Sequence, residues 1–152
     1  MWQKINNDND VRRFMSKMYY FHDSCLKELK YLSGAYVNEN SMHAINDCRI
    51  LSLIIQRGFD DYPMVELEFS GLKSLKLFPV DEKYTCEILD STMFIKDGYV
   101  YWCDHTIYPG TELDNSTGVL VCAKSFRWRP IENHMGSEEY YRGGQGGGLR
   151  EP

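Results

Sequence analysis

Residues 64–104 read MVELEFSGLKSLKLFPVDEKYTCEILDSTMFIKDGYVYWCD, and this stretch decides the fold class of the chain. At its start, apolar residues such as Val65 and Leu67 alternate with polar ones. A period of two is typical of a strand with one buried face and one wet face. Further on, Asp97-Gly98 separates two runs of β-forming residues, which is a strong hairpin signal. We therefore expect the middle of the chain to be antiparallel sheet.

Segments on both sides of this stretch extend the predicted sheet. One of them, residues 25–37, has a pattern that also fits a helix, but we favour a strand that ends at Asn38-Glu39-Asn40. Another, residues 48–56, is apolar on both faces, as a central covered strand would be. Gly71 interrupts the alternation, so we expect a bulge or bend there. With the remaining segments, about seven strands are predicted, over residues 25–37, 48–56, 64–69, 75–77, 85–95, 99–104 and 119–129.

One amphipathic helix is predicted near the N-terminus, from Asp10 to about Tyr20, after the possible capping residues Asp8, Asn9 and Asp10. Its apolar residues recur at helical spacing and need an apolar surface to pack on. The fold class is therefore α+β and mostly β, with this helix packed on an antiparallel meander that forms a half-barrel or a two-layer sandwich.

We expect a single domain over residues 1–132. Residues 133–152 are Gly-rich and are expected to form a flexible tail, because such a sequence buries too little to offset its ordering entropy. Within it, His134-Met135-Gly136-Ser137 resembles a remnant of a cloning vector.

Composition narrows the classes of function. The chain has 152 residues, 43% hydrophobic and 26% charged, with a formal net charge of −5, so phosphate binding by clustered basic residues is not expected and we predict no nucleic-acid partner. The first residues are polar and no long apolar run follows, so we predict no signal peptide and no membrane partner, and the expected compartment is cytoplasmic. The five cysteines form no CxxC pair, and we interpret them as structural.

Two short motifs contain residue types used in catalysis. Phe21-His22-Asp23 follows the predicted helix, and its role is unknown; we favour a helix-exit device, in which His22 interacts with the helix dipole and Asp23 bonds the next turn. A metal-hydrolase site would need further His and Asp residues nearby. Farther along, Cys103, Asp104 and His105 suggest a nucleophile, but in a strand Asp104 would point away from the other two. We therefore predict no catalytic residues, no metal site and no cofactor.

Acidic residues gather between two turns and one strand face. Asp60 and Asp61 lie in a predicted turn, and Glu66 and Glu68 lie on the same side of the next strand. Residues spaced in this way on a wet face are usually solvated, but a basic protein surface is the ligand they would suit best. These four residues are our predicted partner-binding site.

The order of elements resembles a group of small bacterial proteins that carry an FHD-type motif after a first helix. The resemblance rests on Phe21-His22-Asp23-Ser24, followed by RILSLIIQ, VELEFSGLKSLKL, EILDSTMFI and VYWCD, and it covers roughly residues 14 to 130. Some members look like immunity proteins of polymorphic toxin systems, which bind and neutralise a cognate toxin. The resemblance implies a cytoplasmic, β-rich domain that acts by binding, and it supplies no catalytic residues.

The predicted function is therefore a non-enzymatic protein-interaction module, and the resemblance implies an immunity protein that blocks a basic toxin surface. The alternative is a protein that holds a small apolar ligand in the aromatic mouth of its curled sheet. We expect a monomer or a dimer paired through edge strands.

Overall fold

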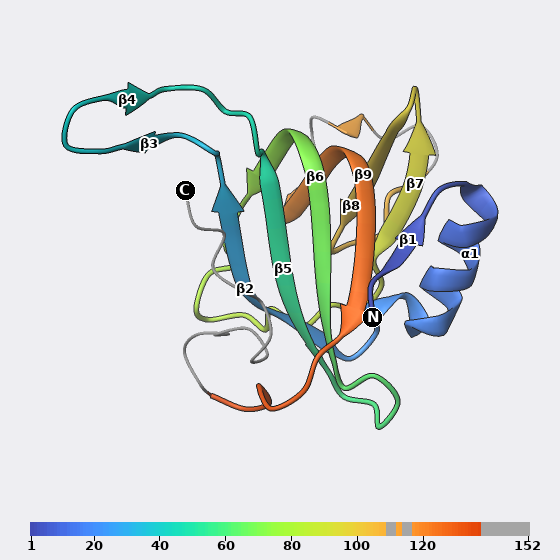
Figure 1. The fold of residues 1–152 in the computed structure, drawn as a ribbon. Helices are drawn as coiled ribbons and strands as arrows, with labels where there is room; N and C mark the ends of the chain where they lie inside the picture. The colour runs from blue at the N-terminus through green and yellow to red at the C-terminus, as the bar shows by residue number, and fades with distance from the viewer. Residues whose placement is uncertain (109–111, 114–116, 138–152) are drawn as a thin grey trace.

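The computed structural model describes residues 1–108, 112–113 and 117–137. Its elements follow in this order along the chain: β1 (Gln3–Ile5), α1 (Asp8–Lys17), the short 3-10 turn η1 (Tyr19–Phe21), β2 (Ser24–Leu32), β3 (Tyr36–Val37), β4 (Met42–His43), β5 (Ile50–Arg57), β6 (Met64–Leu77), β7 (Thr92–Lys96), β8 (Tyr99–Cys103) and β9 (Val119–Pro130). The predicted class is confirmed: one N-terminal helix packs on an antiparallel sheet of seven strands that is not closed into a barrel (Figure 1).

The strand order departs from a sequential meander in one place. The sheet runs β2-β5-β6-β9-β8-β7, so the last strand lies between β6 and β8. Along its other edge β9 has two partners in turn, because β8 pairs with its first half and β1 with its second half. Every pair is antiparallel, and the sheet is one continuous layer rather than two packed layers.

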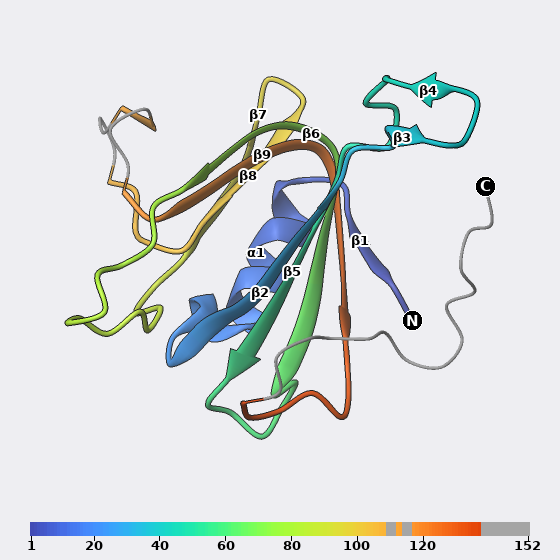
Figure 2. The same ribbon diagram turned by 90° about the vertical axis from the view of Figure 1, so that its left-hand side faces the viewer.

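The two longest strands bend the sheet over the helix. The register between β6 and β9 shifts between Leu72 and Ser74, next to Gly71 with its φ of +64°, which confirms the bulge predicted there. Figure 2 shows β6 and β9 curving over α1, which lies on the concave side of the sheet. The concave side of the sheet, where sequence analysis placed a possible apolar ligand, is therefore occupied by α1.

A side-chain cap fixes the start of the helix, and packing in the core holds its middle. It begins two residues earlier than expected, because Asn7 rather than Asp8, Asn9 or Asp10 is the cap; its side chain accepts a hydrogen bond from the Asp10 amide. It also ends earlier, at Lys17. Phe14 is buried, with its ring 5.2 Å from that of Phe126 and 5.3 Å from that of Trp128. The concave core contains the buried side chains Val11, Met15, Met18, Phe21, Leu53, Ile55, Leu67, Phe69 and Trp102.

The opposite face of the sheet has a smaller apolar cluster, made of Ile54, Met64 and Ile131. The chain after β9 crosses beside it, because the Gln56 amide donates to the carbonyls of His134 and Gly136. His134 is itself buried, so the segment that sequence analysis assigned to a flexible tail from residue 133 packs on the sheet as far as these residues. The rest of that predicted tail, residues 138–152, lies outside the described residues. Among the described residues, no helix is long and apolar enough to cross a membrane.

Candidate functional site

The predicted acidic strand face is not a free negative surface. Glu66 forms an ion pair with Arg129 at 2.7 Å, and Glu68 forms an ion pair with Arg127 at 2.8 Å; both pairs join the neighbouring strands β6 and β9. The two carboxylate side chains are only 11% and 13% exposed, so the expectation of a wet face is wrong. Trp2 lies over both guanidinium groups, 4.3 and 4.4 Å from its ring centre. Because both carboxylates are already paired and mostly buried, they offer little to a basic partner.

Asp60 and Asp61 lie apart from that ladder, in the exposed turn between β5 and β6. The backbone of this turn is fixed by the buried Arg57, whose guanidinium donates to the carbonyls of Asp61 and Tyr62 at 2.6 and 2.8 Å. The structure thus brings together Glu66 with Glu68 and Asp60 with Asp61, but as two separate features. Binding of a partner at Asp60 and Asp61 stays a prediction.

The Phe21-His22-Asp23 motif lies in a left-handed turn rather than at a helix end. Tyr19, Tyr20, Phe21 and Asp23 have φ between 50 and 57°, a conformation that costs roughly 1–2 kcal/mol per residue for L-amino acids. Phe21 offsets part of this cost, because its side chain is fully buried in the core. The turn redirects the chain from α1 into β2, which explains why an aromatic anchor stands here.

His22 ties this turn to the segment before β7. Its Nδ1 donates to the Leu89 carbonyl, and its ring lies 3.4 Å from the Asp23 carboxylate. The hydrogen bond to Leu89 and, secondarily, the charge of Asp23 raise the pKa of His22 above its usual value of 6.5. The helix-dipole role expected for His22 is wrong, because α1 ends at Lys17 and the imidazole bonds a different segment.

The Cys103-Asp104-His105 stretch forms a structural clamp. Cys103 is fully buried, and burial raises the pKa of its thiol, so little of the nucleophilic thiolate forms. Asp104 accepts the Val119 amide at 2.9 Å and contacts the His105 Nδ1 at the same distance. Asp104 thus joins the end of β8 to the start of β9, while the Cys103 thiol contacts the carbonyls of Thr92 and His105. In the part of the chain that the structure describes, no three His, Cys, Asp or Glu side chains gather where they could hold a metal ion.

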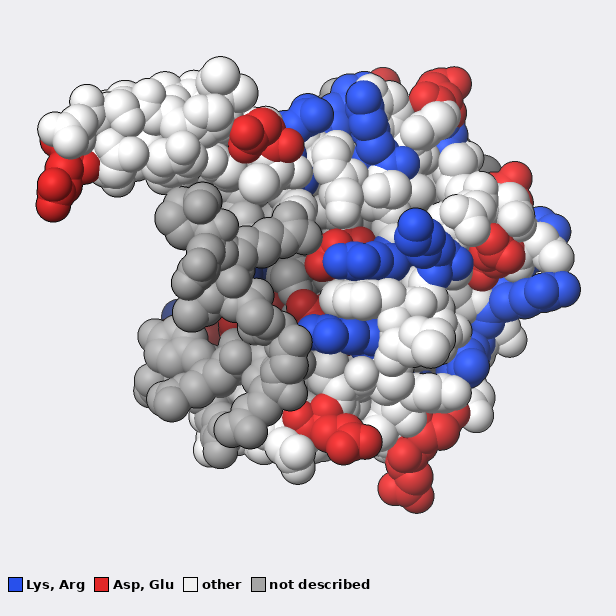
Figure 3. Space-filling model, in the orientation of Figure 1, with Lys and Arg blue, Asp and Glu red and all other residues white. Residues whose placement is uncertain are grey.

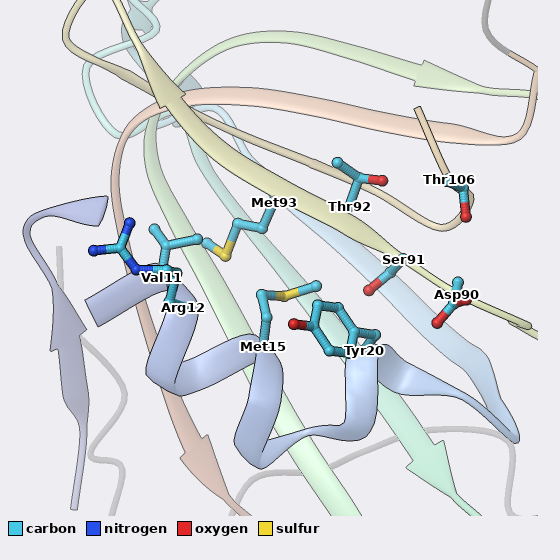
Figure 4. Close-up of a pocket in the computed structure, with 9 residues that line it drawn as sticks. All are labelled: Val11, Arg12, Met15, Tyr20, Asp90, Ser91, Thr92, Met93 and Thr106. Carbon is cyan, nitrogen blue, oxygen red and sulfur yellow. The ribbon is translucent and has the colours of Figure 1, made fainter. Parts of the chain in front are cut away.

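A pocket of about 380 Å³ opens between α1 and the start of β7. Its walls are largely apolar, and Figure 4 shows Val11, Met15 and Met93 between Arg12 on one side and Asp90 on the other. Tyr20, Ser91, Thr92 and Thr106 complete the lining. The Ser91 hydroxyl is buried and finds no hydrogen-bond partner among the described residues. Such a mixture of apolar wall and polar rim suits a small amphiphilic molecule.

A second feature, which sequence analysis missed, is the arm formed by residues 33–47. Here the predicted strand 25–37 does not continue: β2 ends at Leu32, and β3 and β4 form a separate two-stranded sheet. Figure 1 shows this arm projecting from the edge of the main sheet. The main sheet cannot stabilise a hairpin that lies outside it, so the order of the arm must come from its own contacts.

Local hydrogen bonds fix both ends of the arm. At the tip, Asn38 Oδ1 accepts from the Ser41 amide at 2.9 Å and from the Ser41 hydroxyl at 2.8 Å. At the base, the Cys48 amide donates to the Ser33 carbonyl at 3.0 Å. Gly34 has a φ of +96°, and a Cβ there would lie 1.9 Å from Asp47 Oδ1, so only glycine fits.

The arm exposes apolar side chains on its two paired strands. Tyr36 pairs with His43 and stacks on it at 5.1 Å, while Val37 pairs with Met42 on the other face. Val37 and Met42 are 71% and 68% exposed, and Ile45 is 60% exposed. Because an isolated two-stranded hairpin is at best marginally stable in water, this exposed apolar surface calls for a functional explanation.

The charge of the arm has one sign. Residues 33–47 contain Glu39 and Asp47 but no Lys or Arg. Figure 3 shows the arm as uncharged along its length, with acidic groups at its tip and at its base. His43 donates to Asp47 at 3.0 Å, and this hydrogen bond lowers the pKa of the Asp47 carboxyl. An apolar arm with acidic ends fits a partner groove that is apolar inside and basic at its rim.

Comparisons with protein-family models, with curated proteins and with solved structures give no match for this chain.

Proposed function

We propose that this protein is a non-enzymatic interaction module that binds a protein partner through the arm of residues 33–47. The observation that carries this proposal is the exposure of Val37 and Met42 on a hairpin whose tip and base are both fixed. A hairpin held at its tip and base by local hydrogen bonds loses less conformational entropy on binding than an unstructured loop of the same length.

We propose further that the partner is a protein toxin, as the resemblance to immunity proteins implies. The arm would enter an apolar cleft with a basic rim and block it, with Glu39 and Asp47 facing the basic groups. The exposed Asp60–Asp61 turn is a secondary contact in this proposal. The Glu66 and Glu68 face has no part in it, because Arg129 and Arg127 already pair with those carboxylates.

The test purifies the products of the genes encoded on either side of this one and measures their binding to this protein by titration calorimetry. Burying Val37 and Met42 contributes about 1.5 kcal/mol each, so the double variant Val37→Ser/Met42→Ser should bind roughly a hundredfold more weakly. The matched control Val80→Ser/Tyr84→Ser changes two side chains that are 50% and 73% exposed outside the arm, and it should bind like the wild type.

Two results would count against the proposal. If no neighbouring gene product binds the wild-type protein at micromolar concentration, the toxin partner is wrong. If a partner binds but the double variant retains full affinity, binding takes place elsewhere and the arm is not the interface.

We propose small-ligand binding as the second candidate function, favoured by the pocket between α1 and β7. The candidate ligand is an apolar carboxylic acid, with its chain against Met15 and Met93 and its carboxylate at Arg12. Octanoate should shift the NMR signals of these residues, and Arg12→Met should weaken its binding while Arg13→Met should not. Absence of shifts at millimolar octanoate would remove this candidate.

A further inference from the structure

Two exposed cysteines that are distant in the sequence meet at one edge of the sheet. Cys25 lies at the start of β2, and Cys86 lies in the connector of residues 78–91 between β6 and β7. An antiparallel bridge pairs Ser24 with Ile88, whose amide donates to the Ser24 carbonyl at 2.8 Å. Figure 2 shows this connector beside the beginning of β2. The bridge therefore holds the two cysteine-bearing segments together.

The thiols of the two cysteines lie close to each other. Burial raises the pKa of the Cys25 thiol above its usual value, and the nearby Cys86 thiol raises it further through its charge and a side-chain hydrogen bond. In the register of the Ser24–Ile88 bridge, Cys25 lies opposite Glu87 and Cys86 opposite Leu26, so the two cysteines are diagonal rather than direct neighbours. A disulfide needs about 4.4–6.8 Å between Cα atoms, and a small shift of the connector against β2 would bring the two cysteines into that range.

The other three cysteines have different surroundings. Cys103 and Cys122 are buried, where a thiol serves as a small apolar side chain. Cys48 is exposed at the base of the arm, where its amide bonds Ser33. Among the five cysteines, Cys25 and Cys86 thus combine exposure to solvent with a bridge that joins their segments.

We propose that Cys25 and Cys86 form a reversible intramolecular disulfide, which makes the pair a redox modification site that ties the connector 78–91 to the sheet edge. The oxidant is a small-molecule disulfide such as glutathione disulfide. The thiolate of one cysteine attacks a glutathione sulfur and releases one glutathione thiolate, which leaves a mixed disulfide. The thiolate of the second cysteine then attacks the protein sulfur and releases the second glutathione. The two thiols lose two protons and two electrons, and one glutathione disulfide is reduced to two glutathione molecules.

The bond would restrict local opening of the connector. In the reduced protein the connector is held to β2 by the Ser24–Ile88 bridge. A covalent link beside that bridge limits the conformations the connector can reach, and cleavage by a protease requires such opening. Lys83 is an exposed tryptic site in this connector, so it reports on the restriction. Neither cysteine lies in the arm, so the outcome is independent of the function proposed above.

The experiment equilibrates the folded, reduced protein with glutathione buffers of increasing oxidising strength, alkylates the remaining thiols, and measures intact and peptide masses. We expect Cys25 and Cys86 to lose their thiols together in a linked peptide pair, Cys48 to carry at most a mixed disulfide with glutathione, and tryptic cleavage after Lys83 to become several-fold slower. Cys48→Ser should keep the disulfide. Cys86→Ser should lose it and leave glutathione bound at Cys25.

The proposal is overturned if the wild type keeps all five thiols in the most oxidising buffer. It is equally overturned if Cys25 and Cys86 each end as a separate mixed disulfide with glutathione, or if the new bond joins two copies of the chain. Unchanged cleavage after Lys83 in the disulfide form would overturn the tethering role.

Discussion

Arg57 is expected to hold the left-handed turn after α1, and its replacement by Met tests this. Its side chain is 2% exposed, and burial lowers the pKa of the guanidinium. Besides the Asp61 and Tyr62 carbonyls, it donates to the Met18 carbonyl at 3.2 Å, at the end of the helix. The guanidinium thus joins α1 to the β5–β6 turn with three hydrogen bonds.

The expected loss of stability depends on which of the three carbonyl groups can form a hydrogen bond with water once the guanidinium is removed. Asp61 and Tyr62 are partly open to solvent, so their carbonyls find new partners. Met18 is fully buried, and without Arg57 its carbonyl keeps only the bond from the Phe21 amide. One lost hydrogen bond from a charged donor amounts to about 1.5–3 kcal/mol. Arg57 also lies over the rings of Tyr19 and Phe59, 5.9 and 5.3 Å from their centres, and the loss of these contacts adds ~0.5–1 kcal/mol. Relief of the buried charge offsets part of this sum, so Arg57→Met should lower the free energy of unfolding by about 2 kcal/mol.

Urea unfolding followed by tryptophan fluorescence measures this change. With a slope of about 1–3 kcal/mol per molar urea, the midpoint should fall by roughly 1 M. Arg57→Lys should lie between wild type and Arg57→Met, because an ammonium cannot reach all three carbonyls. Arg13→Met, on the exposed face of α1, should change the free energy by less than about 0.5 kcal/mol. A loss for Arg57→Met no larger than that of Arg13→Met would refute the reasoning.

Three further changes test other parts of the structure. The NMR titration of His22 should give a pKa above 6.5, and Asp23→Asn should lower that pKa. Because the pKa of His22 is higher in the folded than in the unfolded protein, protonated His22 stabilises the fold fully below pH 6.5, and this stabilisation is lost as the pH rises through the folded-state pKa. A measured pKa at or below 6.5 would contradict this reasoning. Glu66→Gln should destabilise the protein by about 1–3 kcal/mol, because Arg129 loses its buried partner, and an unchanged unfolding midpoint would contradict it. Gly34→Ala should speed amide hydrogen exchange in the arm roughly tenfold but change global stability by less than about 1 kcal/mol, and unchanged exchange would show that the base tolerates a side chain.

The sequence predicts those parts of the fold that depend on local chemistry. Asp97 and Gly98 have φ of 53 and 76°, as a tight hairpin turn requires, and β7 and β8 pair across them. The bulge beside Gly71 is also where a break in alternation indicated it. In both places a single glycine determines the backbone, so neighbours in the sequence suffice to predict the structure.

The position of β9 depends on pairing between distant segments, and sequence analysis missed it although a signal was present. Glu66 and Glu68 alternate along β6, and Arg127 and Arg129 alternate along β9 with the same period. Read together, these two patterns predict adjacent antiparallel strands with opposite charges on one face. Read separately, Glu66 and Glu68 suggested a free binding surface, whereas their carboxylates pair with Arg129 and Arg127.

The left-handed turn at residues 19–21 was not predictable from local preference. Two tyrosines and a phenylalanine disfavour positive φ, because the Cβ atom approaches the following carbonyl oxygen. The turn forms because tertiary contacts outweigh that preference: Phe21 enters the core, and the Ser91 amide donates to the Tyr20 carbonyl at 2.8 Å. Neither contact is visible in a segment read by itself.

The arm is difficult to explain as a mere connection. β2 and β5 are antiparallel neighbours paired as far as Leu32 and Ile50, and two strands in that position are commonly joined by a loop of about two to five residues. The chain between them instead builds a second sheet, in which the backbone at the base requires Gly34 and the side chain of Asn38 orders the tip. A solvent loop of this length would be expected to carry polar residues, whereas Val37 and Met42 present apolar surface on paired strands. A surface that is ordered, apolar and left open by the rest of the described fold is what binding to another protein requires, and this is the physical basis of the proposed function.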